Sequence, residues 1–173
     1  EASLNGAIVG MAQNFVGSNN INVLQPIGQF GSRLLGGDDS ASPRYIHTKL
    51  DPIVDAIYYR EDKDLLTAML DDDGYPIEPQ YYLPVIPMLL VNGTVGIGTG
   101  FSTNIPPYNP AELVSLMKCR LDGTIDTLSG HELDPWWFGF TGKVVRYDEN
   151  TWATKGSWTI DYAKNAIIIN ELP

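Results

Sequence analysis

Apolar residues recur at helical spacing at the start of the chain, at Leu4, Ile8, Met11, Ala12 and Phe15. This spacing predicts an amphipathic helix from residue 1 to about residue 15, with Glu1 near the positive end of the helix dipole. Ser3 and Asn5 lie off the apolar stripe. Turn-forming residues follow over 17–20, and the glycines and proline of residues 25–43 predict a loop with short strands.

A second helical pattern covers residues 45 to about 59, with apolar residues at Ile46, Leu50, Ile53, Val54 and Ile57. Pro52 is tolerated near the start of such a helix. A helix, a glycine-rich hairpin and another helix follow one another in the order of a winged helix. We therefore predict a winged-helix domain over residues 1–83.

The pattern changes in the second half of the chain, which is rich in Pro and Gly over residues 75–110. The apolar run 85–91 before Asn92-Gly93 predicts a strand and a tight turn. A helix is predicted over residues 110–121, and the runs 142–147, 152–154 and 166–169 predict strands of an antiparallel sheet. The fold class is therefore α+β, and we expect residues 84–173 to form part of a second domain that is incomplete at Pro173.

The chain has 173 residues, 43% of them hydrophobic, and a net charge of −10. It contains no apolar run long enough to cross a membrane, no targeting signal, and no Cys/His cluster with metal-ligand spacing; Cys119 is the single cysteine. The negative charge argues against a nucleic-acid partner. However, residues 1–50 are neutral and the acidic excess lies beyond Asp51, so any DNA-binding surface should lie early in the chain.

The sequence Ser42-Pro43-Arg44-Tyr45 places a fixed cation beside a phenol at the end of the glycine-rich loop. A phenol is a poor nucleophile until a base, a cation or a metal stabilises its oxyanion. Arg44 keeps its charge and can bind a phosphate with two donors. This arrangement suits phosphate chemistry, although an Arg-Tyr pair taken alone is more often a surface ion pair beside a packed ring.

Three longer motifs extend this interpretation: Ala12 to Asn20 (AQNFVGSNN), Gln25 to Gly31 (QPIGQFG) and Gly36 to Tyr45 (GGDDSASPRY). Together with Pro84 to Met88 (PVIPM), Asn92 to Gly100 (NGTVGIGTG) and, more weakly, Glu171-Leu172-Pro173, they resemble the breakage-reunion region of the eukaryotic kind of type IIA DNA topoisomerase. The resemblance covers nearly all of the chain. It implies a winged helix over 1–83 followed by part of an α/β tower domain over 84–173.

The resemblance implies that Tyr45 attacks a DNA phosphodiester and becomes linked to a 5′ phosphate, while Arg44 neutralises the scissile group. It also implies that further side chains contact DNA, namely Ser3, Asn5, Gln29, Arg33, Lys49 and an intercalating Ile97. The partner is then double-stranded DNA, no membrane is involved, and two subunits supply one tyrosine each.

The family's Mg²⁺ and ATP sites are expected outside this chain, which should be inactive by itself. The enzyme is expected in the nucleus, or at the viral replication site if a virus encodes it. Two positions depart from the family pattern, because Asp38 stands where a lysine is common and His47 where an aromatic residue is usual.

Alternatives remain open on the sequence alone. Arg44 and Tyr45 could contact phosphate in a non-catalytic winged-helix module, or the chain could be a scaffold without nucleic acid. By pattern alone, Ile97 would be a core isoleucine of a strand. The aromatic cluster Trp136, Trp137, Phe138 and Phe140 is expected to pack in a core or interface in preference to stacking on bases.

Overall fold

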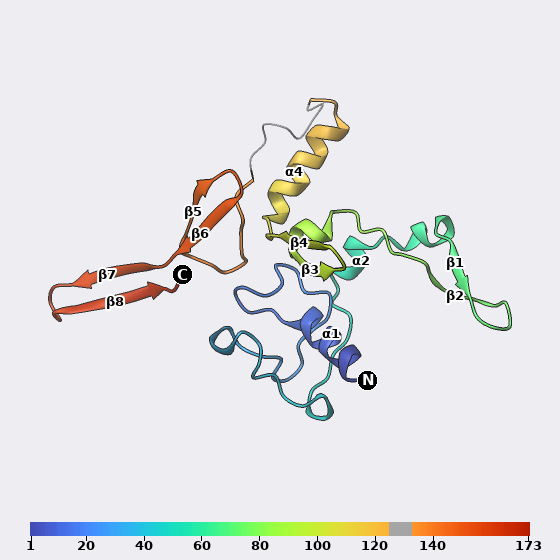
Figure 1. The fold of residues 1–173 in the computed structure, drawn as a ribbon, viewed down its shortest axis with the longest axis horizontal. Coiled ribbons are helices and arrows are strands. Elements are labelled where there is room, and N and C mark those ends of the chain that lie inside the picture. The colour runs from blue at the N-terminus through green and yellow to red at the C-terminus, as the bar shows by residue number, and fades with distance from the viewer. Residues whose placement is uncertain (125–132) are drawn as a thin grey trace.

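The computed structural model describes residues 1–124 and 133–173. A central body carries three projections that point in different directions: helix α4 (Pro110–Leu121), the hairpin of β1 (Ala68–Leu70) and β2 (Pro76–Pro79), and the hairpin of β7 (Ser157–Asp161) and β8 (Ala166–Glu171) (Figure 1). The N-terminal helix α1 (Ala2–Ala12) and the hairpin of β3 (Thr94–Gly98) and β4 (Phe101–Ile105) lie in the central body.

Helix α1 confirms the predicted N-terminal helix but ends at Ala12, about three residues early. The Asn19 side chain explains the end, because its Nδ2 donates to the carbonyls of Gly10 at 2.7 Å and Gln13 at 2.8 Å. These carbonyls belong to the last turn, which has no further helical N–H to bind. Ala12 is fully buried, whereas Leu4 and Met11 remain exposed.

The helix predicted over residues 45–59 is wrong over most of its length. Residues 43–45 form a short 3-10 turn, residues 46–51 are extended, and only α2 (Val54–Ile57) is helical. The extended part pairs with residues 23–27 through the bridges Leu24↔Leu50 and Ile27↔His47. Ile46 thereby joins Ala12 and Phe30 in the buried cluster, so a tertiary contact outweighs the helical spacing of the apolar residues.

The strand predicted over residues 85–91 is also wrong, because Met88–Val91 form the short helix α3. The strand begins after the Asn92-Gly93 turn, and its five residues pair in register with β4, from Thr94↔Ile105 to Gly98↔Phe101. The Asn92 side chain holds this turn in place, because it accepts a hydrogen bond from Ile21 N–H and donates one to Ile21 C=O. Helix α4 confirms the prediction over residues 110–121, with Asn109 as its N-cap.

The C-terminal strands are confirmed as antiparallel, although they form two separate hairpins. Strand β5 (Lys143–Asp148) pairs with β6 (Thr151–Lys155), and β8 pairs with β7, a strand that the sequence pattern did not predict. Another short 3-10 helix, Arg60–Leu65, precedes β1. Every sheet of the described residues has two strands.

The main buried cluster is small and consists of Ala12, Phe30 and Ile46, against which Val9, Leu24 and Ala41 pack. Asn20 connects this region with the second half of the chain. Its Nδ2 donates to the carbonyls of Val91 (2.8 Å) and Trp136 (2.9 Å), and its Oδ1 accepts from Phe138 N–H (2.7 Å). One asparagine therefore holds together segments up to 118 residues apart in the sequence.

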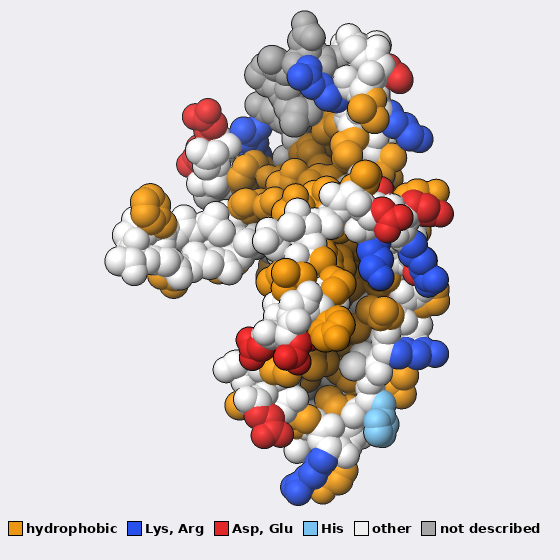
Figure 2. Space-filling view, turned by 90° about the vertical axis from the view of Figure 1, so that its right-hand side faces the viewer, with side chains coloured by type: hydrophobic (Ala, Val, Ile, Leu, Met, Phe, Trp, Pro, Cys, Tyr) orange, Lys and Arg blue, Asp and Glu red, His pale blue; other side chains and the backbone are white. Residues whose placement is uncertain are grey.

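Many apolar side chains stay open to solvent, and Figure 2 shows hydrophobic side chains gathered over the middle of one face. Within the described residues, no helix has both the length and the apolar character needed to cross a membrane.

Candidate functional site

Tyr45 ends the 3-10 turn Pro43–Tyr45, and its side chain is 69% exposed. The turn is closed by the Tyr45 N–H, which donates to the Ser42 carbonyl at 2.9 Å. The next residue, Ile46, is buried in the core and fixes the chain immediately after the tyrosine. The phenol is therefore presented to solvent from a backbone anchored directly beside it.

The Arg44 guanidinium lies over the Tyr45 ring, with its Cζ 5.1 Å from the ring centroid. Of the carboxylates in the described ranges, none pairs with Arg44, so the expected alternative of a surface ion pair is not found. Lys49 is also exposed and without an ion pair among these residues. A phosphate approaching the phenol would therefore meet a cation that does not first have to break an ion pair with a carboxylate.

The loop before Tyr45 is closed on itself at several points. At its base, Ala41 N–H donates to the Gln29 carbonyl at 2.9 Å. Gly31 has a φ of 105°, and a Cβ at this position would lie 2.6 Å from the Cα of Gly37. Gln13 of the α1 C-cap donates to the Phe30 carbonyl at 2.9 Å. The loop is thus packed tightly against the helix end, and only glycine fits where its two sides meet.

Asp39 organises the interior of this loop. Its two carboxylate oxygens accept from Ser32 N–H at 2.7 Å and from Gln29 Nε2 at 3.0 Å. Hydrogen bonds from Ser32 are the main cause that lowers the pKa of Asp39 below its ordinary value of 3.8. The side chain of Gln29, a predicted DNA contact, is therefore hydrogen-bonded within the loop, although Gln29 remains exposed to solvent.

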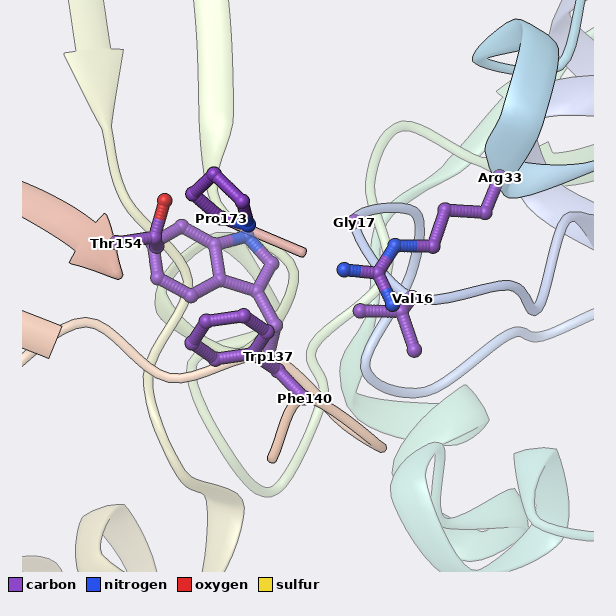
Figure 3. Close-up of a pocket in the computed structure, with 7 residues that line it drawn as sticks. All are labelled: Val16, Gly17, Arg33, Trp137, Phe140, Thr154 and Pro173. Atoms are coloured by element: carbon purple, nitrogen blue, oxygen red, sulfur yellow. The ribbon is translucent and has the colours of Figure 1, made fainter. Parts of the chain in front are cut away.

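Arg33 lies in the same loop, in the 3-10 turn Arg33–Leu35, and is held by the far end of the chain. Its Nη1 is 2.8 Å from Glu171 Oε1, and its Nη2 donates to the Leu172 carbonyl at 3.1 Å. Figure 3 shows its guanidinium beside Val16, across a cavity of about 220 Å³ from Trp137 and Phe140. The structure thus places Arg33 at the junction with β8, bound to protein acceptors.

The other predicted contacts are spread over the molecule. Ser3 is exposed and Asn5 half-buried on the first turns of α1. Ile97 lies on β3 and is 92% exposed, so the alternative of a core isoleucine is wrong. In the aromatic cluster, Trp136 lies edge-on to Phe138 and Trp137 to Phe140, but Phe138 is 61% exposed, so the expected packing in a core or interface stays a prediction.

Two residues of importance were missed by the sequence analysis, Asn20 and Glu171. Asn20 lies within a quoted motif, but its partners are 71 to 118 residues away. Glu171 also belongs to a motif of the resemblance, Glu171-Leu172-Pro173, and it is a lone acid at the end of an apolar strand, but neither feature indicated its partners.

A metal site is not built by the side chains that the structure describes, in which no group of three or more His, Cys, Asp or Glu side chains could hold an ion. The resemblance places the Mg²⁺ site outside this chain, and no chemical step is assigned to a metal here.

Residues 1–173 match the family of the DNA gyrase and topoisomerase IV A subunits. Similar curated proteins include DNA topoisomerase 2 top-2 of Caenorhabditis elegans, at 49% identity over the whole of this chain and 11% of the relative. The probable DNA topoisomerase 2 of Dictyostelium discoideum is 46% identical with the same coverages. DNA topoisomerase 2 of Acanthamoeba polyphaga mimivirus is 45% identical over the whole chain and 13% of the relative.

Among solved structures, the topoisomerase II DNA-binding, cleavage and re-ligation domain of Plasmodium falciparum superimposes with a TM-score of 0.86 at 40% identity. The match covers 99% of this chain and 23% of that one, and it confirms the α+β fold class. The chain spans only 11 to 13% of the length of the three curated relatives.

Proposed function

This chain belongs to the family of the DNA gyrase and topoisomerase IV A subunits, and from that premise we propose that Tyr45 is the nucleophile that breaks and rejoins a strand of duplex DNA. The observation that carries the proposal is the exposed phenol of Tyr45 beneath an arginine that has no carboxylate partner among the described residues. The Plasmodium relative, whose name includes cleavage and re-ligation, supports the same assignment.

In the proposed reaction, the Tyr45 Oη attacks a phosphorus atom of the DNA backbone and forms a new P–O bond. The bond from phosphorus to the 3′ oxygen breaks, and the proton lost by the phenol is balanced by the proton gained by the released 3′ hydroxyl. Because the phosphotyrosyl bond is itself a phosphodiester, the 3′ hydroxyl can reverse the attack and reseal the strand.

Arg44 has the role of stabilising charge on the phosphate. Its guanidinium is always protonated and can donate two parallel hydrogen bonds to phosphate oxygens. It lies over the Tyr45 ring, with its Cζ 5.1 Å from the ring centroid, so the cation stands beside the phenol that would attack. We assign both residues to the cleavage site.

Further DNA contacts are proposed for Ser3, Asn5, Gln29 and Lys49, with Gln29 exchanging its bond to Asp39 for one to DNA. Arg33 is left out of this set because Glu171 and Leu172 hold its guanidinium. The exposed Ile97 is proposed as an apolar wedge that enters a base step and bends the duplex.

At the level of the whole enzyme, we propose an ATP-dependent and Mg²⁺-dependent homodimer that cleaves both strands, passes a second duplex through the break and reseals it. The metal and the nucleotide would bind outside this chain. Residues 1–83 would form its winged helix and residues 84–173 part of its tower. The enzyme would work in the nucleus, or at the viral replication site if the gene is viral.

The test is the substitution Tyr45→Phe in a full-length enzyme of this family that carries this chain. Covalent DNA–protein adducts trapped by denaturant should disappear, because the nucleophilic oxygen is gone, while the affinity for duplex DNA should change less than about twofold. Tyr75→Phe is the matched control, since Tyr75 is exposed to a similar degree and lies on the hairpin of β1 and β2.

Adducts that persist in the Tyr45→Phe enzyme would reject Tyr45 as the nucleophile. Binding of DNA without any adduct in the unsubstituted enzyme would instead favour a non-catalytic winged-helix module.

A further inference from the structure

Glu171 is the one buried charged residue that the described part of the chain contains, at 8% exposure. A buried carboxylate is costly unless hydrogen bonds and an opposite charge compensate it. In this case Oε2 accepts from the N–H and the hydroxyl of Thr141, both at 2.9 Å, and Oε1 accepts from Leu172 N–H at 3.0 Å. Arg33 completes the shell at 2.8 Å. Every buried polar side-chain atom in the described ranges has a partner.

Arg33 makes two contacts to this junction, one with the Glu171 carboxylate and one with the Leu172 carbonyl. Two donors of one planar guanidinium engaged with two acceptors fix its direction as well as its distance. The side chain is 38% exposed, so the pair lies at the edge of the body and is partly shielded from water. Its geometry is that of a clamp between the loop and the end of β8.

The loop transmits the position of Arg33 toward Tyr45. Ser32, the neighbour of Arg33, donates its N–H to Asp39 and accepts from Gly37 N–H at 3.0 Å. The loop closes where Ala41 binds Gln29, and the 3-10 turn with Tyr45 begins two residues later. A path of hydrogen-bonded loop residues therefore connects the clamp with the turn that carries the phenol.

We propose that Glu171 is a positioning residue for DNA cleavage, acting through Arg33 on the loop that leads into Arg44 and Tyr45. The inference rests on the proposed function of Tyr45 and deepens it. Glu171 contacts no substrate in this role. It sets the place of the loop, and with it the place of the phenol relative to the phosphate, so the hairpin of β7 and β8 becomes part of the cleavage apparatus.

The experiment compares Glu171→Gln, Arg33→Ala and the double variant with the unsubstituted full-length enzyme. The rate of adduct formation is measured at saturating DNA, together with the dissociation constant for the duplex, at a temperature where each variant is fully folded by its melting curve. We expect both single variants to slow the saturating rate on the order of tenfold, since a misplacement of about 1 Å can cost up to a hundredfold.

The dissociation constant should stay within about twofold in both variants. The double variant should be no slower than the slower single variant, because residues that act through one another give non-additive effects. Glu78→Gln is the matched control, because Glu78 is exposed on β2 and its loss should leave both quantities unchanged. A role in folding alone would lower the melting temperature without changing the saturating rate of the folded enzyme.

Three outcomes would overturn the proposal. The first is an unchanged saturating rate in Glu171→Gln. The second is additive losses in the double variant. The third is weaker, less salt-dependent DNA binding in Arg33→Ala alone, which would make Arg33 a DNA ligand. Failure of the proposed function is recognised separately, because adducts that persist in Tyr45→Phe reject the nucleophile, whereas the Glu171→Gln rate reports on the clamp.

Discussion

At the scale of single residues, Glu171 carries the largest resolved change in acidity. Hydrogen bonds from Thr141, N–H first and hydroxyl second, lower the pKa of Glu171 from its ordinary 4.5 to about 2, and the bond from Arg33 adds to this. The lowered pKa means that the folded chain favours the charged carboxylate more than the unfolded chain does. Glu171 therefore stabilises the fold above pH 4.5, and this contribution is lost as the pH falls toward 2.

The resulting prediction is a loss of unfolding free energy between pH 4.5 and about 2 that depends on Glu171. Denaturant unfolding of the full-length enzyme at a series of pH values, followed by a signal from this segment, would measure it. Glu171→Gln should be less stable at neutral pH and should lose less stability over the acid range. A Glu171→Gln profile parallel to that of the unsubstituted enzyme would contradict the lowered pKa.

At the scale of elements, local signals gave reliable predictions. Helix α4 starts at Pro110 behind the Asn109 cap, which is a complete start signal within two residues, and its predicted bounds are confirmed. The turn-bounded apolar strands β5, β6 and β8 were found for the same reason. The motif around Tyr45 was found by resemblance, and its Arg44 neighbour proves to be free of carboxylates among the described residues.

The errors arose where distant residues decide the structure. Residues 46–51 have helical spacing, yet they pair with 23–27 and bury Ile46 in the core. Residues 88–91 have the apolar pattern of a strand, yet Asn92 forms a turn that is bound to Ile21. Strand β3 begins only after this turn. The ion pair of Arg33 and Glu171 could not be inferred at all, because no local feature of either residue indicates a partner 138 positions away.

The contacts of Asn20 between distant elements predict a loss of stability when its side chain is removed. Asn20→Ala removes hydrogen bonds to Val91, Trp136 and Phe138, of which the first two are partly buried, and leaves these backbone groups without their partner. At about 1 kcal/mol for each bond, the unfolding free energy should fall by roughly 3 kcal/mol. Thermal or denaturant unfolding would measure the loss.

Asn14→Ala is the matched control from the same motif, because Asn14 is exposed. Its effect should stay within about 0.5 kcal/mol. Equal losses in the two variants would show that Asn20 does not join the two halves of the chain.

At the scale of the whole molecule, surface and charge distribution matter most. The accessible surface is 12651 Å², whereas a compact protein of 19.1 kDa would expose about 8400 Å² by the usual size relation. The excess comes from the projecting hairpins and from apolar side chains such as Val95, Phe101 and Leu65. The net charge of −10 is also uneven, since residues 1–50 are neutral.

Because the charge is uneven, we expect the site at which an aspartate is replaced by lysine to decide the effect on DNA binding. Asp38→Lys and Asp73→Lys change the net charge equally, but Asp38 is exposed on the loop before Arg44, and Asp73 lies on the turn between β1 and β2. Asp38→Lys should tighten DNA binding at low salt and steepen the slope of log K against log salt by about one. Asp73→Lys should change neither quantity measurably. Equal effects would show that only the total charge matters.

The bond between Arg33 and Leu172 joins residues 139 apart, and this separation sets an order of events during biosynthesis. The hairpins contain only neighbouring residues and can form within microseconds of leaving the ribosome. In contrast, Arg33 in the loop before Tyr45 can bind Glu171 and Leu172 only after nearly all of these residues have been translated. In the proposed mechanism, a newly made chain therefore holds its nucleophile before it holds the contacts that position it.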